Sequence, residues 1–162
     1  MGIMEVLIPN DICSIKLSNK STKNARVTKL DGSHVFGKVP SLNDKFPEGD
    51  IILKLGYQGF YNSSNNLLQG AFGLRHIWDK HRAEIGATNA EDVVRFVESI
   101  LKVGADILID ESKHANKPLV IESSTGMVIL ELKSPQNEDA YYTIITAYDR
   151  KSHPGTLMGN IK

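Results

Sequence analysis

The sequence predicts an α+β fold in which two helices pack on one antiparallel β-sheet of four or more strands. Apolar residues recur at helical spacing through residues 70–85 and again through residues 88–104. After Gly104 the pattern changes to alternation with a period of two, which is typical of half-buried strands. Helices followed by an antiparallel meander indicate an α+β protein whose helices cover one face of the sheet.

The composition is that of a folded domain of ordinary size. The chain has 162 residues, of which 41% are hydrophobic and 23% are charged, so it can bury a core. Nineteen basic side chains balance 19 acidic ones, which counts against a non-specific nucleic-acid binder but not against an enzyme with a local cationic cleft. The single cysteine, Cys13, allows no intrachain disulfide. We find no signal peptide and no 18-residue apolar run.

The first part of the chain is predicted to form short strands separated by turns. Strand-like runs lie at residues 5–8, 13–17, 26–30 and 34–39, and Asp31-Gly32 indicates a hairpin between the last two. Residues 40–50 form a polar connector with two prolines. Residues 51–55 are a short strand, and residues 57–66 are a loop rich in Tyr, Gly, Asn and Ser.

Two helices and four strands follow. The helix predicted over residues 70–85 ends at Gly86, and Thr88-Asn-Ala-Glu91 forms a capping box that begins the next helix. The strands are expected at residues 107–110, 119–122, 127–133 and 141–148. In the last strand we expect one face to carry Tyr142, Ile144, Thr146 and Tyr148.

The first of these helices carries the side chains best suited to proton transfer. It holds two imidazoles, His76 and His81, and an imidazole exchanges protons near neutral pH. It also holds Arg75, Lys80 and Arg82, whose cations can stabilise phosphate oxygens. The structural alternative is a surface helix with solvated charges and one half-buried histidine. The two histidines are five residues apart, not four, with no Glu between them, so we expect no metal. The sequence has no phosphate loop and no dinucleotide fingerprint, so we expect no other cofactor.

These motifs resemble a family of nucleases. The run Phe72-Gly-Leu-Arg-His-Ile-Trp-Asp-Lys-His81, the capped helix, the four strands and the final Ile-Thr-Ala-Tyr148 resemble the phage-barnase-like branch of a superfamily. That superfamily groups barnase, EndoU-type and colicin D-type toxins with RelE-like RNases (the BECR fold). The resemblance covers residues 50–160 and implies a metal-independent endoribonuclease toxin domain of a bacterial or phage system.

The resemblance also implies roles for particular residues. Colicin D-like members place a Lys and a His on a helix, and a Ser and an aromatic residue on a late strand. Lys80, His81, Thr146 and Tyr148 match those places, with Thr in place of Ser. Barnase-like members use a Glu as the base, and either Glu122 or Glu131 is a candidate for that role here.

The resulting hypothesis is RNA cleavage by attack of a 2′-OH on the adjacent phosphodiester, with tRNA as one candidate substrate. The catalytic candidates are His81 as acid or base with His76 as second choice, Lys80, Thr146 to orient the phosphate, and Tyr148. The substrate-binding candidates are Arg75, Arg82 and Glu122. The expected partners are RNA and a cognate immunity protein, without a membrane or a metal.

The expected domain organisation follows from the same resemblance. Residues 46–162 would form the RNase toxin-like domain, and residues 1–45 a strand-rich N-terminal extension or a segment for entering target cells. The expected location is the cytoplasm of the target cell, after secretion as part of a larger bacterial protein. The alternative is a non-catalytic binding or adaptor domain of a phage or secretion system. The two hypotheses differ in whether His81 and Thr146 converge on one cleft or His81 packs only against apolar side chains.

Overall fold

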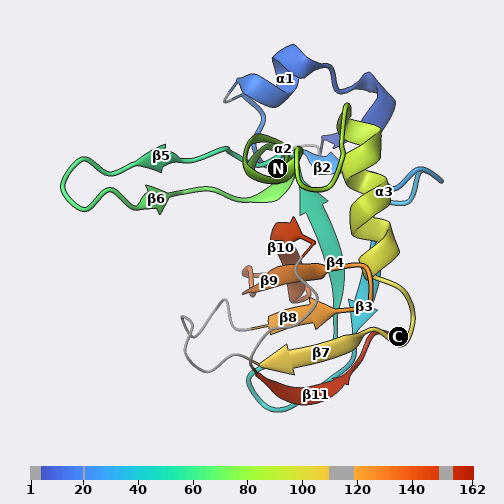
Figure 1. Ribbon diagram of the computed structural model, residues 1–162. Coiled ribbons are helices and arrows are strands. Elements are labelled where there is room, and N and C mark those ends of the chain that lie inside the picture. The colour runs from blue at the N-terminus through green and yellow to red at the C-terminus, as the bar shows by residue number, and fades with distance from the viewer. Residues whose placement is uncertain (1–4, 20, 110–118, 150–154) are drawn as a thin grey trace.

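The computed structural model describes residues 5–19, 21–109, 119–149 and 155–162. Within these ranges the fold is α+β, with three α-helices packed on a large mixed sheet of nine strands (Figure 1). The helices are α1 (Ser14–Ser18), α2 (Gly73–His81) and α3 (Ala90–Ile100), preceded by a 3-10 turn (Pro9–Asp11). The strands are β1 (Val6–Leu7), β2 (Arg26–Val27), β3 (Gly37–Val39), β4 (Gly49–Lys54), β5 (Phe60–Tyr61), β6 (Leu68–Gln69), β7 (Asp106–Ile109), β8 (Leu119–Glu122), β9 (Met127–Lys133), β10 (Tyr141–Tyr148) and β11 (Thr156–Asn160).

The sheet is mixed, so the prediction of a purely antiparallel sheet was wrong. Its order is β1-β2-β4-β10-β9-β8-β7-β11, with β3 also paired to β4. The meander β7–β10 is antiparallel as predicted, but β10 pairs with β4 in parallel, as β1 does with β2. Parallel neighbours require a long connection, and helices α2 and α3 and the five strands β5–β9 lie between β4 and β10 in the chain. Strand β11, which the sequence analysis did not predict, pairs with β7.

The N-terminal segment differs from expectation in two places. The strand predicted at residues 13–17 is the helix α1, which buries Leu17. Strands β2 and β3 do not form the predicted hairpin, because each pairs separately with β4. The turn at Asp31-Gly32 is present, with Gly32 at a φ of +93°. Ile12, Leu17 and Val27 nevertheless share one core with α2 and α3, so this segment extends the sheet of the domain.

Helices α2 and α3 supply the core with their apolar faces. Leu74 and Ile77 of α2 and the valines of α3 are fully buried against alternate residues of the central strands. Helix α3 begins one residue later than the predicted capping box. Its N-cap is Asn89, which accepts a hydrogen bond from the Asp92 backbone N–H at 2.8 Å, and Asp92 in turn accepts from Thr88.

A close contact between two glycine-containing segments, the one just after β4 and the one that begins α2, sets the first residue of α2. Gly56, just after β4, has a φ of +79°, and a Cβ on it would lie 1.9 Å from the carbonyl oxygen of Phe72. Gly73 has a φ of +77°, and a Cβ there would lie 2.5 Å from the carbonyl oxygen of Lys54. The left-handed backbone and the close approach both require glycine. The helix therefore begins at Gly73 and not at residue 70 as predicted.

A β-bulge in β10 decides which of its side chains share a face. The register with β9 shifts between Ile144 and Thr146. Tyr142 and Ile144 consequently face the helix-covered core together with Ala147. The prediction that all four residues Tyr142, Ile144, Thr146 and Tyr148 lie on one face of the strand was therefore wrong. Thr146 and Tyr148 pair with Ile129 and Met127 of β9, on the opposite side of the sheet, which we call the second face.

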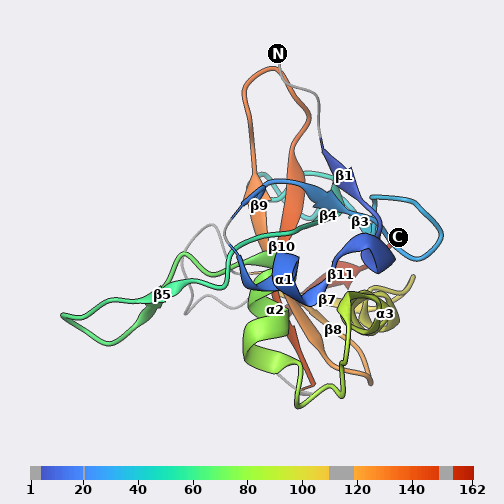
Figure 2. The same ribbon diagram turned by 90° about the horizontal axis from the view of Figure 1, so that it is seen from above.

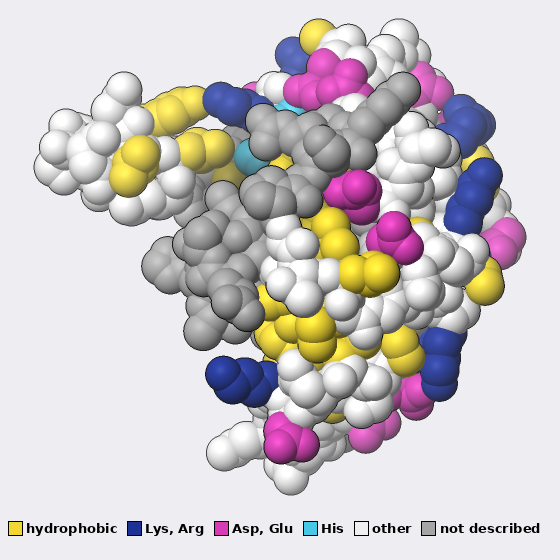
Figure 3. Space-filling view, turned by 60° about the horizontal axis from the view of Figure 1, so that its bottom comes forward, with side chains coloured by type: hydrophobic (Ala, Val, Ile, Leu, Met, Phe, Trp, Pro, Cys, Tyr) yellow, Lys and Arg dark blue, Asp and Glu magenta, His cyan; other side chains and the backbone are white. Residues whose placement is uncertain are grey.

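Helix α2 lies beside the C-terminal half of β10. Within β10, strand β4 pairs with the first three residues only, Tyr141–Thr143. Helix α2 packs against β10, as Figure 2 shows from above. Between β4 and α2 the chain forms a projecting arm with β5 and β6, where the sequence predicted a loop (Figure 1). Hydrophobic side chains lie along this arm (Figure 3), and Phe60, Tyr61 and Leu67 are all more than half exposed.

Candidate active site

The end of α2 and the end of β10 meet at a cavity of about 390 Å³ lined by His81, Glu84, Tyr148 and Asp149. His81 is the last residue of α2, and Glu84 follows in the turn that leads to Gly86. Nδ1 of His81 lies 2.6 Å from Oε1 of Glu84. The centroid of the His81 ring lies 5.4 Å from that of Tyr148. Of the predicted catalytic residues, the structure thus brings His81 and Tyr148 together.

Glu84 is held as a carboxylate. Burial raises its pKa, but the hydrogen bonds from His81 and Asp149 outweigh burial, and the pKa lies below the usual range for Glu. A carboxylate can only accept, so the hydrogen bond requires the proton to sit on Nδ1 of His81. In the neutral ring, Nε2 then carries a lone pair. The His81 side chain retains 17% of its exposure, so solutes can reach the ring. This arrangement suits a general base.

His76 packs beside His81 but has different properties. The two ring centroids are 5.7 Å apart in an edge-on arrangement. Burial, reinforced by His81 and Lys80, lowers the pKa of His76 to about 4. Its Nδ1 is buried without a hydrogen-bond partner among the described residues. At neutral pH this imidazole is uncharged and shielded, so His81 is the better of the two candidates for acid–base chemistry.

Thr146 does not line the His81 cavity. It shares the second face of β10 with Tyr148, two residues further along the strand. Its hydroxyl is buried and has no hydrogen-bond partner in the described part of the chain. The predicted convergence of His81 and Thr146 on one cleft is therefore absent from the described residues. His81 does not pack only against apolar side chains either, because Glu84, Tyr148 and Asp149 line its cavity.

The exposed cations at the end of α2 have different partners. Lys80 donates to the Tyr61 hydroxyl at 3.0 Å, and this hydrogen bond raises its pKa. The Lys80 ammonium thus lies at the projecting arm. The guanidinium of Arg82 lies over the Trp78 ring, 5.1 Å from its centroid, and donates to the Trp78 carbonyl. Arg82 remains exposed and open to a substrate anion.

Arg75 is a buried structural residue. It is 0% exposed, and its guanidinium donates to the carbonyls of Lys16 and Gly56 and to Oδ1 of Asn19. These three bonds tie α1 and the end of β4 to α2. A guanidinium enclosed in this way cannot contact a phosphate, so the predicted substrate-binding role of Arg75 is corrected to a structural one.

The two acidic alternatives lie away from the His81 cavity. Glu122 pairs in register with Met127, which pairs with Tyr148, so Glu122 and Tyr148 are two strands, or about 10 Å, apart. Glu131 is 7% exposed, forms an ion pair with Lys133 and lies opposite Thr143 near the other end of β10. The acidic residue that reaches His81 is Glu84, which the sequence analysis missed although its i,i+3 spacing from His81 could have indicated it.

Neither a metal cluster nor a membrane helix is present in the described ranges. No group of three or more His, Cys, Asp or Glu side chains is placed to hold a metal ion there. None of the described helices has the length and apolar character needed to cross a membrane. Comparison with protein-family models, characterised proteins and solved structures gives no match. Functional assignment therefore depends on the geometry of the site.

Proposed function

We propose that this domain is a metal-independent endoribonuclease whose acid–base residue is His81. The observation that carries the proposal is the His81–Glu84 hydrogen bond at the wall of an open cavity that also contains Tyr148. A histidine oriented by a carboxylate beside a space for substrate is the arrangement that general acid–base catalysis requires. The resemblance of residues 72–81 and 145–148 to RNase toxins supplies the substrate class.

The proposed reaction uses the free ring nitrogen of His81. Nε2 accepts the proton of an RNA 2′-OH, and the 2′-oxygen attacks the adjacent phosphorus. The bond from phosphorus to the 5′-oxygen breaks, which yields a 2′,3′-cyclic phosphate and a 5′-hydroxyl end. The imidazolium, stabilised by the Glu84 carboxylate, returns its proton to the departing oxygen. Tyr148 contacts the phosphate or a base, and Arg82 and Lys80 contribute positive charge.

The test is cleavage of total RNA by the purified chain in excess EDTA, followed by mapping of the new ends. We expect cuts at defined positions, with tRNA among the substrates, and cyclic phosphate termini. His81→Ala protein purified in parallel reports any contaminating nuclease. Intact RNA after incubation with wild-type protein would refute the proposal. Activity lost in EDTA and restored by zinc or magnesium would refute its metal-independent form.

The toxin role is a further part of this proposal. A toxin must be neutralised in the cell that makes it, so we propose a cognate immunity protein that is acidic and covers the His81 site. Expression of wild-type protein alone in bacterial cytosol should arrest growth, while His81→Ala protein should be tolerated. Harmless expression of soluble wild-type protein would argue against the toxin role.

The projecting arm favours a second candidate, a non-catalytic binding or adaptor domain. Phe60 and Tyr61 are 51% and 57% exposed, and exposed aromatic side chains are frequent at protein interfaces. An adaptor would retain its partner when His81 is replaced, and would lose it when Phe60 and Tyr61 are replaced together by Ser. A ribonuclease would lose RNA cleavage when His81 is replaced and would keep it when Phe60 and Tyr61 are replaced.

A further inference from the structure

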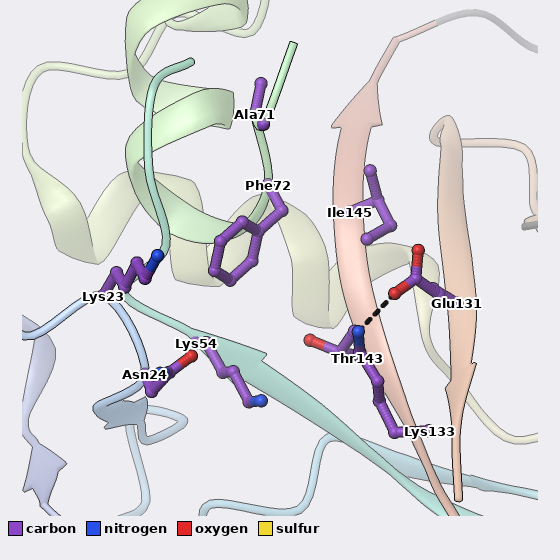
Figure 4. A pocket seen from close by; sticks show the side chains of 10 residues that line it. Lys23, Asn24, Lys54, Ala71, Phe72, Glu131, Lys133, Thr143 and Ile145 are labelled. Carbon is purple, nitrogen blue, oxygen red and sulfur yellow. Dashed lines mark ion pairs between the residues drawn. The ribbon is translucent and has the colours of Figure 1, made fainter.

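A second cavity lies on the second face of the sheet, near the start of β10. It encloses about 380 Å³, a size common among small-molecule sites. The side chains that matter for its chemistry are those of Lys23, Lys54, Phe72, Glu131, Lys133 and Thr143, and we call this cavity the lysine pocket. Figure 4 shows that they come from β4, β9, β10, the segment before β2 and the segment just before α2.

The lysine pocket carries an excess of positive charge. Three ammonium groups line it against one carboxylate, that of Glu131, which pairs with Lys133. The Lys54 ammonium donates to the Tyr141 hydroxyl at 3.0 Å, which is an uncharged partner. The charge of Lys54 is therefore available to a ligand, and the ligand that this balance favours is an anion.

Thr143 adds a donor that needs an acceptor. Its side chain is 1% exposed, and its hydroxyl has no hydrogen-bond partner among the described residues. The register places it between Ile52 of β4 and Glu131 of β9, in the wall of the pocket. A buried hydroxyl without a partner is unfavourable, and a ligand oxygen would satisfy it.

Phe72 gives the pocket an aromatic wall. Its ring faces the strands that carry Lys54 and Thr143 (Figure 4), and the residue is half-buried. Aromatic rings that stack bases beside cations that hold phosphates are the common means of binding single-stranded nucleic acids. The combination of lysines, an unsatisfied hydroxyl and one ring thus matches a nucleotide unit better than a simple inorganic anion.

We propose that the lysine pocket binds one phosphate group of a single-stranded RNA, with the neighbouring base against Phe72. This inference rests on the proposed ribonuclease function and extends it. Strand β10 joins the two sites, since Thr143 lines the lysine pocket and Tyr148 lines the His81 cavity. Both residues lie on the second face, about 14 Å apart at roughly 3.4 Å per residue, because their partners on β9, Glu131 and Met127, are four residues apart. The pocket holds the RNA strand away from the bond that is cut.

The experiment measures binding without cleavage. Wild-type protein is titrated with a short 2′-O-methyl oligoribonucleotide, which has no attacking hydroxyl, at several salt concentrations, and separately with inorganic phosphate. We expect Lys54→Gln to weaken RNA binding and to reduce the slope of log K against log salt by about 0.7, the value for one phosphate contact. Lys102→Gln, an exposed lysine at the end of α3, is the matched control and should leave the slope unchanged.

Thr143→Val separates a ligand contact from a structural role. It keeps the shape of the side chain and removes the hydroxyl, so we expect weaker binding of both RNA and phosphate with no loss of thermal stability. RNA affinity that is equal in wild type, Lys54→Gln and Thr143→Val would overturn the inference, as would binding of phosphate without binding of RNA. Wild-type protein that binds the oligonucleotide through these residues but never cleaves RNA would support the lysine pocket and refute the proposed ribonuclease.

Discussion

Nδ1 of His81 lies 2.6 Å from Oε1 of Glu84, although the helix that carries His81 ends at that residue. The orientation of the imidazole therefore depends on the turn that follows α2. Hydrogen bonds from Ile85 N–H to His81 C=O and from Ala87 N–H to Arg82 C=O hold that turn. This local arrangement, together with the contact between His81 and Tyr148, defines the candidate active site.

Replacement of His81 by Ala should remove RNA cleavage. A lost general acid or base costs about 10²-fold or more in rate, and the place of the partly exposed ring at the end of α2, outside the core, predicts an unchanged fold. Single-turnover cleavage of a bulk tRNA pool measures the loss, and circular dichroism checks the fold. His34→Ala is the control, because His34 lies in the turn before β3. Full activity in both His81→Ala and His76→Ala would exclude α2 from the chemistry.

Replacement of Glu84 by Gln should reduce kcat while KM changes little. The amide can still hold the ring through its carbonyl oxygen, but it cannot stabilise an imidazolium by charge. We expect a loss of roughly tenfold or more, since orienting carboxylates beside catalytic histidines carry effects of this size or larger. Glu138→Gln, an exposed position in the loop after β9, is the matched control. Equal kcat values in wild type and Glu84→Gln would show that the carboxylate has no catalytic role.

The buried imidazole of His76 should make the protein less stable in mild acid. Its pKa of about 4 in the folded state lies below the usual value of 6.5. Between these two pH values the unfolded chain binds more protons, so stability rises with pH and is lost on acidification. The loss attributable to this group is about 3 kcal/mol between pH 7.5 and pH 4.

Urea unfolding of wild type and His76→Phe across this pH range measures the contribution. Phe keeps an aromatic ring in the space but cannot titrate. The difference between the two free energies of unfolding should therefore change with pH below 6.5 and stay constant above it. Parallel curves for the two proteins over the whole range would show that His76 titrates normally in the folded state.

Replacement of Arg75 by Met should destabilise the fold without a specific effect on RNA binding. The change leaves two backbone carbonyls and the Asn19 side chain without their donors, at a cost of about 3 kcal/mol. Arg82→Met, at the C-cap of the same helix, is the matched control, and its exposed position predicts a change within about 0.5 kcal/mol. Chemical denaturation distinguishes the two. An Arg75→Met protein as stable as wild type would contradict the structural role.

Several elements could be predicted from the sequence because their signals are local. Helix α3 has a capping pattern and an apolar stripe within one contiguous segment, and β9 begins as a run of four apolar residues directly after the turn at residues 123–126. The prediction for residues 13–17 failed because five residues with one buried leucine fit a helical turn as well as a strand. Docking of α1 beneath Arg75 decided between them.

The sequence by itself determined an α+β domain with His81 on a helix and Tyr148 at the end of a strand. Only the tertiary structure decided that these two rings meet, because the bulge in β10 and the parallel pairing of β10 with β4 depend on residues far apart in the chain. Burial of Arg75 likewise depends on α1 and its C-cap residue Asn19, which precedes Arg75 by 56 residues. Charge and hydrogen-bonding capacity are visible in a sequence, but exposure and partners arise from packing between distant segments. This packing leaves the His81 ring partly exposed at a cavity and buries the Arg75 guanidinium completely.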